Sequence, residues 1–425
     1  MKAVIAGFLS ILLFSCNSRK RIVETVFIDS LVKNYTPSPL AKGIEGNTLF
    51  WQKRYEEQPG DFVAQEKYAQ SLLSRFHLYT DIADLKKADS LVSSLLQNRN
   101  VSPTGNRLTM AHLKLLEHQF DMAPAFAKNA EDGPSNSFAT AMLSFDVDFE
   151  RGDYTDARLT LLSHKNVSDY AYNFRLSKLE HLYGSPDSAI VHMLKAASIA
   201  TNSFVKAIAL SNAADLYLHS GKVGKAYDLY RQCIAIDRSD FHSIEKLGWI
   251  ALVHDNQPGE AQKIFRFLLG RTNSPLPMLE LSQSFEMTDS VQARDYAQQF
   301  VSMANQPQNG NMYNKYLIEA YTGILKQPSK AVDIARRELL VRQTPQSFAW
   351  MVYALASDNQ LNLAYDVFRK KVSGQPLEGL ELFWMGKMMQ MAGKGYNAAA
   401  FFEAAKKNEF DLSPAMAKEL NSFLE

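Results

Sequence analysis

The sequence lacks the excess of basic residues that is typical of proteins that bind nucleic acids or anionic surfaces. Among its 425 residues, 46 are Lys or Arg and 45 are Asp or Glu, which leaves a formal charge of +1. Because neutralising phosphates requires a clustered excess of cations, we expect no nucleic-acid partner. The hydrophobic fraction of 46% is nevertheless high enough to build a sizeable core.

Cysteine is almost absent, and so are long apolar runs. Cys16 and Cys233 are the two cysteines of the chain, and they stand too far apart in sequence to suggest a disulfide framework or a thiolate metal site. Cys233 falls on the core-facing side of a helical pattern, which predicts an inert buried thiol. No apolar stretch reaches the roughly 18 residues that a membrane-spanning helix requires.

The first sixteen residues have the pattern of an export signal. Met1-Lys2 gives a positive start, and the apolar run from Ala3 to Phe14 spans about 18 Å, too short for a hydrocarbon core of about 30 Å. The run ends in Leu13-Phe14-Ser15-Cys16, which resembles a lipobox. The resemblance implies a lipoprotein signal peptide over residues 1–15 and a lipid on Cys16, the chain's only membrane attachment. An ordinary secretory signal is the alternative.

Residues 16–45 are expected to form a tether between this lipid and the folded part of the chain. The X-Pro pairs in Thr36-Pro37-Ser38-Pro39 oppose a helix. By analogy with known lipoprotein sorting, residues 17–18 lack an inner-membrane retention aspartate, and Arg19-Lys20-Arg21 is not a surface-export acidic run. We expect an outer-membrane lipoprotein of the bacterial cell envelope, for which a Bacteroidota-type envelope is one setting, facing the periplasm rather than the cell surface.

The rest of the chain repeats at intervals of 32 to 38 residues. Four residues after each repeated alanine stands an apolar side chain, and five residues before six of them stands Gly or Asn. These spacings place the apolar groups on one helix face, and Gly or Asn supplies the left-handed residue that ends the preceding helix. Each unit is therefore a helix, a tight turn and a second helix. The alanines are at positions 88, 123, 157, 189, 226, 261, 293, 331, 364 and 398.

The first helix of several units carries a small residue where its partner would cross, as at Ala214, Gly248 and Gly386. Together these positions resemble the tetratricopeptide repeat (TPR) over roughly residues 47–410, most faintly in 104–131 and 275–305. The resemblance implies an all-α fold, an α-solenoid of about ten TPR-like helical hairpins over residues 46–412. Residues 413–425 are expected to form a capping helix that begins at Ser413-Pro414.

No catalytic or metal-binding constellation stands out. Three Ser-x-x-Lys segments, which begin at positions 30, 203 and 243, lack the companion motifs of acyl enzymes. His112 and His118 are six residues apart, the wrong spacing for one metal on a helix. Gly152 in Arg151-Gly152-Asp153 occupies the turn position of a repeat, so this adhesion tripeptide is interpreted as structural. We expect no enzymatic activity, no cofactor and no metal.

In the TPR family, the first helix of each repeat lines a concave groove that binds partners. Carried over position by position, the resemblance implies that Trp249 and Phe383 are groove aromatics, although both residues could instead pack between repeats. The asparagine-lysine clamp of some family members is missing, which disfavours a receptor for chaperone tails. The full set of implied groove residues is Ser211, Asp215, Glu245, Trp249, Tyr353, Phe383 and Lys387.

These expectations combine into a non-enzymatic scaffold or adaptor that holds one or more unknown protein partners and is anchored in the bacterial envelope by an N-terminal lipid. One alternative is a glycan- or ligand-binding outer-membrane lipoprotein accessory to a transporter. The regular repeat spacing leaves little room for the long loops that such proteins insert. The other alternative is an enzyme whose site is assembled from dispersed residues.

Overall fold

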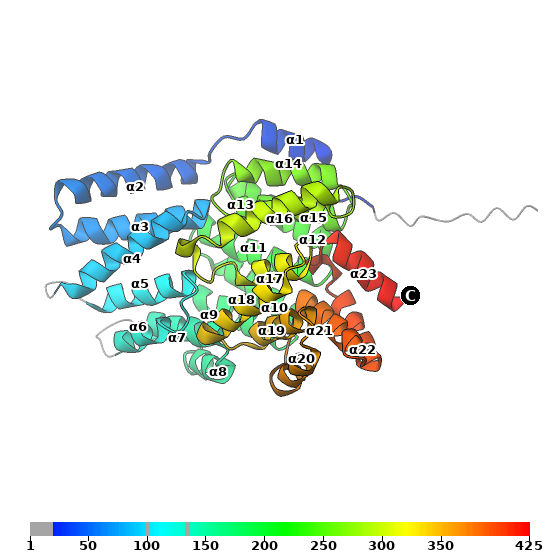
Figure 1. Ribbon diagram of the computed structural model, residues 1–425. Helices are drawn as coiled ribbons and strands as arrows, with labels where there is room; N and C mark the ends of the chain where they lie inside the picture. The colour runs from blue at the N-terminus through cyan, green and yellow to red at the C-terminus, as the bar shows by residue number, and fades with distance from the viewer. Residues whose placement is uncertain (1–19, 99–102, 132–136) are drawn as a thin grey trace, which may run out of the picture.

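The computed structural model describes residues 20–98, 103–131 and 137–425, and this part of the chain is helical without any β-strand (Figure 1). It contains ten consecutive helical hairpins in which each helix packs against the next. The first helices are α3 (Phe62–Tyr79), α5 (Pro103–Leu116), α7 (Ser137–Arg151), α9 (Tyr170–Leu182), α11 (Ser203–His219), α13 (Phe241–Val253), α15 (Leu276–Phe285), α17 (Asn314–Thr322), α19 (Pro345–Ser357) and α21 (Gly379–Met391).

The second helix of each hairpin carries the repeated alanine. These helices are α4 (Ile82–Gln97), α6 (Ala123–Glu131), α8 (Tyr154–Ser163), α10 (Pro186–Ile199), α12 (Val223–Ile236), α14 (Pro258–Leu269), α16 (Ser290–Ala304), α18 (Pro328–Val341), α20 (Leu361–Val367), continued by the π turn η2 (Phe368–Val372), and α22 (Gly395–Lys406). The predicted all-α solenoid of about ten hairpins is thus confirmed. The two faintest repeats also form hairpins, α5–α6 and α15–α16.

Burial and backbone geometry explain the periodicity. All ten repeated alanines are buried, and the most accessible of them, Ala398, is only 3% exposed. The six Gly and Asn residues that precede them all adopt a positive φ, the conformation that reverses the chain between two helices. Thr80, His118 and Lys326 adopt the same positive φ in three other hairpins, whose turns contain no glycine at this position.

The small residues of the first helices allow close helix contact. A Cβ atom at Gly386 would lie 2.5 Å from Cε1 of Phe402, and one at Gly248 would lie 2.8 Å from Cε1 of Phe265. Both rings are buried in the adjoining second helix, where they fill the space that a side chain would occupy. The helix–helix distance in these hairpins is therefore set by the missing Cβ.

The N-terminal part of the described chain differs from the expected tether. α1 (Thr25–Lys33) lies beside α14 with Ile28 fully buried, and α2 (Pro39–Glu57) packs on α3 (Figure 1). Ser38 accepts a hydrogen bond from Ala41 N (3.0 Å), so the Ser-Pro pair that we interpreted as helix-breaking is an N-cap followed by a first-turn proline. Cys16 and the signal peptide lie outside the described residues.

The buried carboxylate of Asp255 fixes the entry of this segment. It accepts hydrogen bonds from Ile22 N (3.0 Å) and Val23 N (2.7 Å) at the end of α13. The chain therefore joins the body of the protein at residue 22, not at residue 46. None of the described helices is both long and apolar enough to cross a membrane.

The solenoid turns tightly enough for successive turns to touch. Residues at or near the helix ends of one turn meet residues of a later turn, at sequence separations of 192 and 189 positions in two of the contacts. Three hydrogen bonds of this kind join Asn273 N to Tyr79 O (2.8 Å), the Tyr154 hydroxyl to Gln346 Oε1 (3.4 Å) and Asn408 Nδ2 to His219 O (2.8 Å).

The C-terminal segment closes this arrangement. The turn η3 (Glu409–Asp411) lies against α11 and α21, and its Phe410 carbonyl accepts a hydrogen bond from Trp249 Nε1 at 2.7 Å. α23 (Pro414–Leu424) then begins after Ser413, whose side chain accepts from Met416 N. α23 packs on α22 and reaches back to α15, so it covers the last hairpin and contacts the preceding turn.

We predict that Gly386→Ala lowers the free energy of unfolding by about 1–3 kcal/mol, because the new methyl group must displace the Phe402 ring. Gly224→Ala is the matched control, since nothing lies within 4 Å of its Cβ position in α12. The control should be neutral or slightly stabilising through reduced chain entropy. Urea unfolding of the purified variants measures both effects, and equal stability of the two variants would contradict the close-contact assignment.

Candidate functional site

A cavity of about 490 Å³ lies where the first helices face one another. Its walls come from α9, α11, α13, α15, α17 and α21, together with η3. This volume suits one long side chain or a small molecule. The charged and titratable residues in its lining, apart from tyrosine, are Lys178, His181, Asp215, His219, His242, Glu245, Lys246, Glu280, Lys315, Glu319, Glu378, Glu381 and Asp411.

Most of these charges are paired. Seven carboxyl groups face three lysines and three histidines, and five of the carboxyl groups have a cationic partner within 4 Å. The pairs are Asp215–His242 (3.0 Å), Glu245–Lys246 (3.0 Å), Glu378–His181 (3.8 Å), Glu381–Lys315 (3.4 Å) and Asp411–His219 (2.6 Å). Lys178 pairs with Glu150 at 3.1 Å, outside this cavity.

Glu280 and Glu319 are the two lining carboxyl groups that form no salt bridge among the described residues. Glu280 is only 8% exposed, and its Oε2 atom is buried without a hydrogen-bond partner. Burial and the nearby charge of Glu245 raise the pKa of Glu280 well above its ordinary range. Burial also tends to raise the pKa of Glu245, but Lys246 and His242 outweigh it, so that pKa is lowered. A hydrogen bond between the two carboxyl groups also raises the pKa of Glu280 and lowers that of Glu245.

Glu319 lies on α17, across from α15. Gln283, one helical turn after Glu280, donates a hydrogen bond from Nε2 to Glu319 Oε1 at 2.7 Å. Burial raises the pKa of Glu319 to about 7 against the opposing charge of Lys315. Glu286, the residue that follows the end of α15, also has its pKa raised to about 7 by burial and by the charge of Glu319. Both carboxyl groups therefore titrate close to neutral pH.

Glu381 contributes a second unpartnered acceptor from α21. Its side chain is fully buried, and Oε1 accepts from Trp350 Nε1 at 2.7 Å and faces Lys315. Its other oxygen, Oε2, has no hydrogen-bond partner. Two buried acceptor atoms, one each from α15 and α21, are thus available to a donor that enters the cavity.

Three of the seven groove residues inferred from the TPR resemblance line this cavity, namely Asp215, Glu245 and Trp249. Asp215 and Glu245 are bound to His242 and Lys246, and the Trp249 indole N–H is bound to η3. Ser211 is 7% exposed and donates its hydroxyl to Ile208 O in its own helix.

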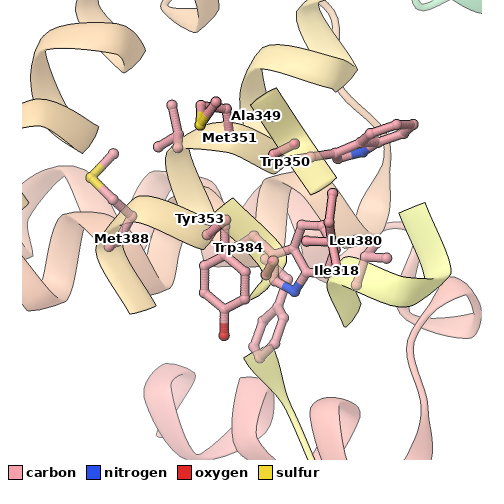
Figure 2. Packing of buried hydrophobic residues seen from close by; sticks show 14 of the residues in the cluster. Ile318, Ala349, Trp350, Met351, Tyr353, Leu380, Trp384 and Met388 are labelled. Atoms are coloured by element: carbon pink, nitrogen blue, oxygen red, sulfur yellow. The ribbon is translucent and has the colours of Figure 1, made fainter. Parts of the chain in front are cut away.

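The other three inferred groove residues lie away from the cavity. Tyr353 stacks on Trp384 with ring centroids 4.9 Å apart, within the apolar cluster that Figure 2 shows. Phe383 is 1% exposed and packs against Phe402, so it is a core residue that no partner can reach. Lys387 forms an ion pair with Glu419 of α23 at 2.8 Å. Phe383 therefore packs within its own hairpin, α21–α22.

The sequence analysis missed Lys246, Glu280, Lys315, Glu319 and Glu381. These residues stand between 12 and 17 positions before the repeated alanine of their hairpins, so no common register marks them in the sequence. They come from four different first helices, α13, α15, α17 and α21, which only the curvature of the solenoid brings around one cavity.

A second cavity of about 1020 Å³ lies along the junction between successive turns. It shares Lys178, Lys315 and Glu381 with the central cavity, so the two spaces adjoin. Arg342 crosses this junction. It pairs with Glu338 at 2.7 Å and with Glu150 at 3.8 Å.

The described residues offer no support for metal or thiol chemistry. They contain no group of three or more His, Cys, Asp or Glu residues arranged to hold a metal ion. Cys233 is fully buried, and burial raises the pKa of its thiol to about 12, which keeps it protonated.

Comparison with known proteins finds only distant similarity. No family model matches the sequence, and no curated protein matches it. The human IFIT1 dimer with PPP-AAAA is similar at a TM-score of 0.46 and 13% identity over 91% of each chain. The APC/C hetero-tetramer Cut9-Hcn1 gives a TM-score of 0.48 and 14% identity over 89% of this chain and 69% of that chain.

A tetratricopeptide repeat protein from Parabacteroides merdae is also similar, with a TM-score of 0.35 and 11% identity over 61% of this chain and 99% of that chain. Similarity at this level carries no information about ligands. The hairpins and their order define the chain as a solenoid of TPR-like repeats. What distinguishes it is the charged cavity that its first helices enclose.

The raised pKa of Glu319 predicts a specific pH dependence of stability. Between its ordinary pKa of 4.5 and about 7, folded Glu319 keeps a proton that the unfolded chain has lost, so its contribution to stability falls as pH rises. Relative to Glu319→Gln, the wild type should lose about 1–3 kcal/mol across this window and then level off. Urea unfolding from pH 4.5 to 8 measures this difference. Parallel profiles would contradict it, and Glu403→Gln on exposed α22 should give a parallel profile.

Proposed function

We propose that this protein is a non-enzymatic scaffold that binds a segment of a protein partner in its central cavity. The observation that carries the proposal is the cavity itself, enclosed by the first helices of six hairpins and of a size that admits a side chain but not a folded domain. The inner surface of a repeat solenoid is the face on which successive repeats can contact one extended ligand.

We also propose that the chain is anchored in the bacterial envelope through a lipid on Cys16, facing the periplasm from the outer membrane. The lipobox-like Leu13-Phe14-Ser15-Cys16 supports this proposal. Asp255 binds the backbone N–H groups of Ile22 and Val23, so the folded part of the protein begins there. Only residues 17–21 would therefore separate the lipid from the folded part. Such an anchor would hold the solenoid close to the membrane surface.

The connections in the described part bear on the glycan-binding alternative. The longest of them, residues 305–313, is compact and includes the 3-10 turn η1 (Pro307–Asn309). A platform of long inserted loops therefore has no counterpart among the described residues. A protein ligand held in the central cavity agrees better with this geometry.

Replacing the lipidated residue tests the anchor. Cys16→Ser should move the protein from the membrane fraction to the soluble periplasmic fraction, because acylation requires the thiol. Cys233→Ala is the matched control and should stay with the membrane, since this thiol is buried in the core. Fractionation of cells with immunodetection measures both variants. Membrane association of Cys16→Ser would contradict the proposed anchor.

Site-specific photocrosslinking in intact cells tests partner binding. A photoreactive residue at Asn212, which lines the central cavity, should capture a protein partner. The same residue at Leu340, which is 81% exposed on the second helix α18, should capture little. Capture is measured as a shifted band identified by mass spectrometry. No adduct at Asn212, or equal adducts at both positions, would contradict binding in the cavity and would favour a glycan or small ligand.

A further inference from the structure

We propose that the central cavity receives an arginine side chain of the partner, and that Glu280 binds its guanidinium group. This inference rests on the proposed function, because it names the chemistry by which a partner segment would be recognised. It concerns the side of the cavity formed by α15 and α17, where the inner surface departs from its general pattern of paired charges.

The first argument is the charge inventory. Every other carboxyl group in the lining has a cationic partner, whereas Glu280 and Glu319 have none among the described residues. Burying a carboxyl group without a partner is unfavourable, and proteins compensate by pairing or by protonation. A cation supplied from outside would complete the pattern.

The second argument is an unsatisfied atom. Glu280 is more than nine-tenths buried, lines the cavity and has an Oε2 atom without a hydrogen-bond partner. Glu381 Oε2, in the same lining, is a second acceptor of this kind. Unpartnered buried polar atoms are rare in folded proteins. Here they mark the positions at which donors of a ligand would bind.

The third argument is that the carboxyl groups are held in place. Glu280 and Gln283 stand one turn apart on α15, and the 2.7 Å hydrogen bond from Gln283 fixes Glu319 on the neighbouring first helix. A guanidinium group is planar and carries five N–H donors, so it can bind the Glu280 carboxylate through two hydrogen bonds and still donate to another acceptor of the lining. A lysine ammonium has only three donors and a compact charge, which makes it the weaker ligand.

The lining disfavours the other ligand classes. The three lysines already have carboxylate partners, so an anion would have to displace Glu150, Glu245 or Glu381. A metal ion is disfavoured because the described side chains form no ligand cluster for one. An organic cation remains the chemistry that fits.

Protonation gives the site a pH signature. Burial and the charge of Glu245 raise the pKa of Glu280, and burial raises that of Glu319 to about 7, so both carboxyl groups bind protons more readily than ordinary carboxyl groups do. A bound cation favours the ionised forms, so binding should release protons and strengthen as pH rises. The charged or titratable groups that face the two residues are Glu245, Lys246, Glu286, Lys315, Tyr316 and Glu381.

Isothermal titration calorimetry with the full-length Cys16→Ser protein tests the proposal. The probe is the blocked tripeptide acetyl-Gly-Arg-Gly-amide, and its control is the same peptide with citrulline, which has nearly the shape of arginine but no charge. At pH 7.5 we expect the arginine peptide to bind at least ten-fold more tightly than the citrulline peptide. We also expect its affinity to increase from pH 6 to pH 8, with proton release detected as a dependence of the heat on the buffer.

The variants assign the effect to residues. Glu280→Gln and the double variant Glu280→Gln, Glu319→Gln should bind the arginine peptide no better than the citrulline peptide. Glu403→Gln should bind it as the wild type does. Gln has nearly the shape of Glu but cannot ionise, so Glu280→Gln buries no ionisable group at this position. The melting temperature of this variant should therefore be unchanged or higher, which separates loss of binding from loss of fold. Equal binding of the two peptides, full binding by the double variant, or no heat at millimolar arginine peptide would each overturn the proposal.

The outcomes also separate this inference from the proposed function. A crosslinked protein at Asn212 without binding of the arginine peptide would refute the guanidinium site and leave the scaffold. Binding of the arginine peptide without any crosslinked protein would support the cation site and refute the protein scaffold.

Discussion

The fold depends on how closely two helices approach within each hairpin. A buried alanine at the start of the second helix, together with a small residue on some of the first helices, fixes that distance, and the following large side chain fills the space beside it. Gly386 shows how narrow the tolerance is, because a single Cβ would overlap the Phe402 ring. With ten hairpins built to nearly one geometry, small rotations between them add up to a superhelix.

A regular superhelix has a consequence that no single hairpin has. Its second turn meets the first at a nearly constant sequence separation, and the contacts at this junction include hydrogen bonds and ion pairs. Because chain ends and turns carry unsatisfied backbone groups, hydrogen bonds such as Asn408 to His219 O satisfy atoms that would otherwise face a neighbouring turn. The same curvature brings the first helices together around one cavity.

Local features of the fold could be predicted from the sequence because they are encoded within one repeat. The alanine spacing, the Gly and Asn turns and the start of α23 after Ser413 all depend on neighbours fewer than forty residues away. The contact between turns could not be predicted, since nothing in one repeat specifies its partner 192 positions further on. The tether was misjudged for a related reason. Pro39 breaks a helix in its interior but begins one after a capping serine, and only packing of α1 and α2 distinguishes the two.

The groove assignment was limited by a different cause. Positions carried over from a repeat family specify which side of a helix faces the axis, but a residue near the end of the array meets a cap instead of open space. Lys387 thus faces α23, and Phe383 is enclosed by its own hairpin. Asp215, Glu245 and Trp249, from the middle of the array, do line the cavity. Ser211, from the same part of the array, does not, so the family register located only some of the cavity residues.

The cost of burying a carboxyl group without a cationic partner explains why a cationic ligand would be favoured in the cavity. A buried ion pair is weak evidence for stability, because apolar residues of similar volume often replace such a pair without loss. A buried carboxyl group without a cationic partner is less favourable still, and burial together with Glu245 raises the pKa of Glu280, which favours its protonated form. Protonation solves the desolvation problem only for the empty protein. The Oε2 atom stays unsatisfied, whereas a donor that brings a positive charge would satisfy the hydrogen bond and the ionised carboxylate together. The instability of the empty site and the selectivity of the filled one therefore have the same physical origin.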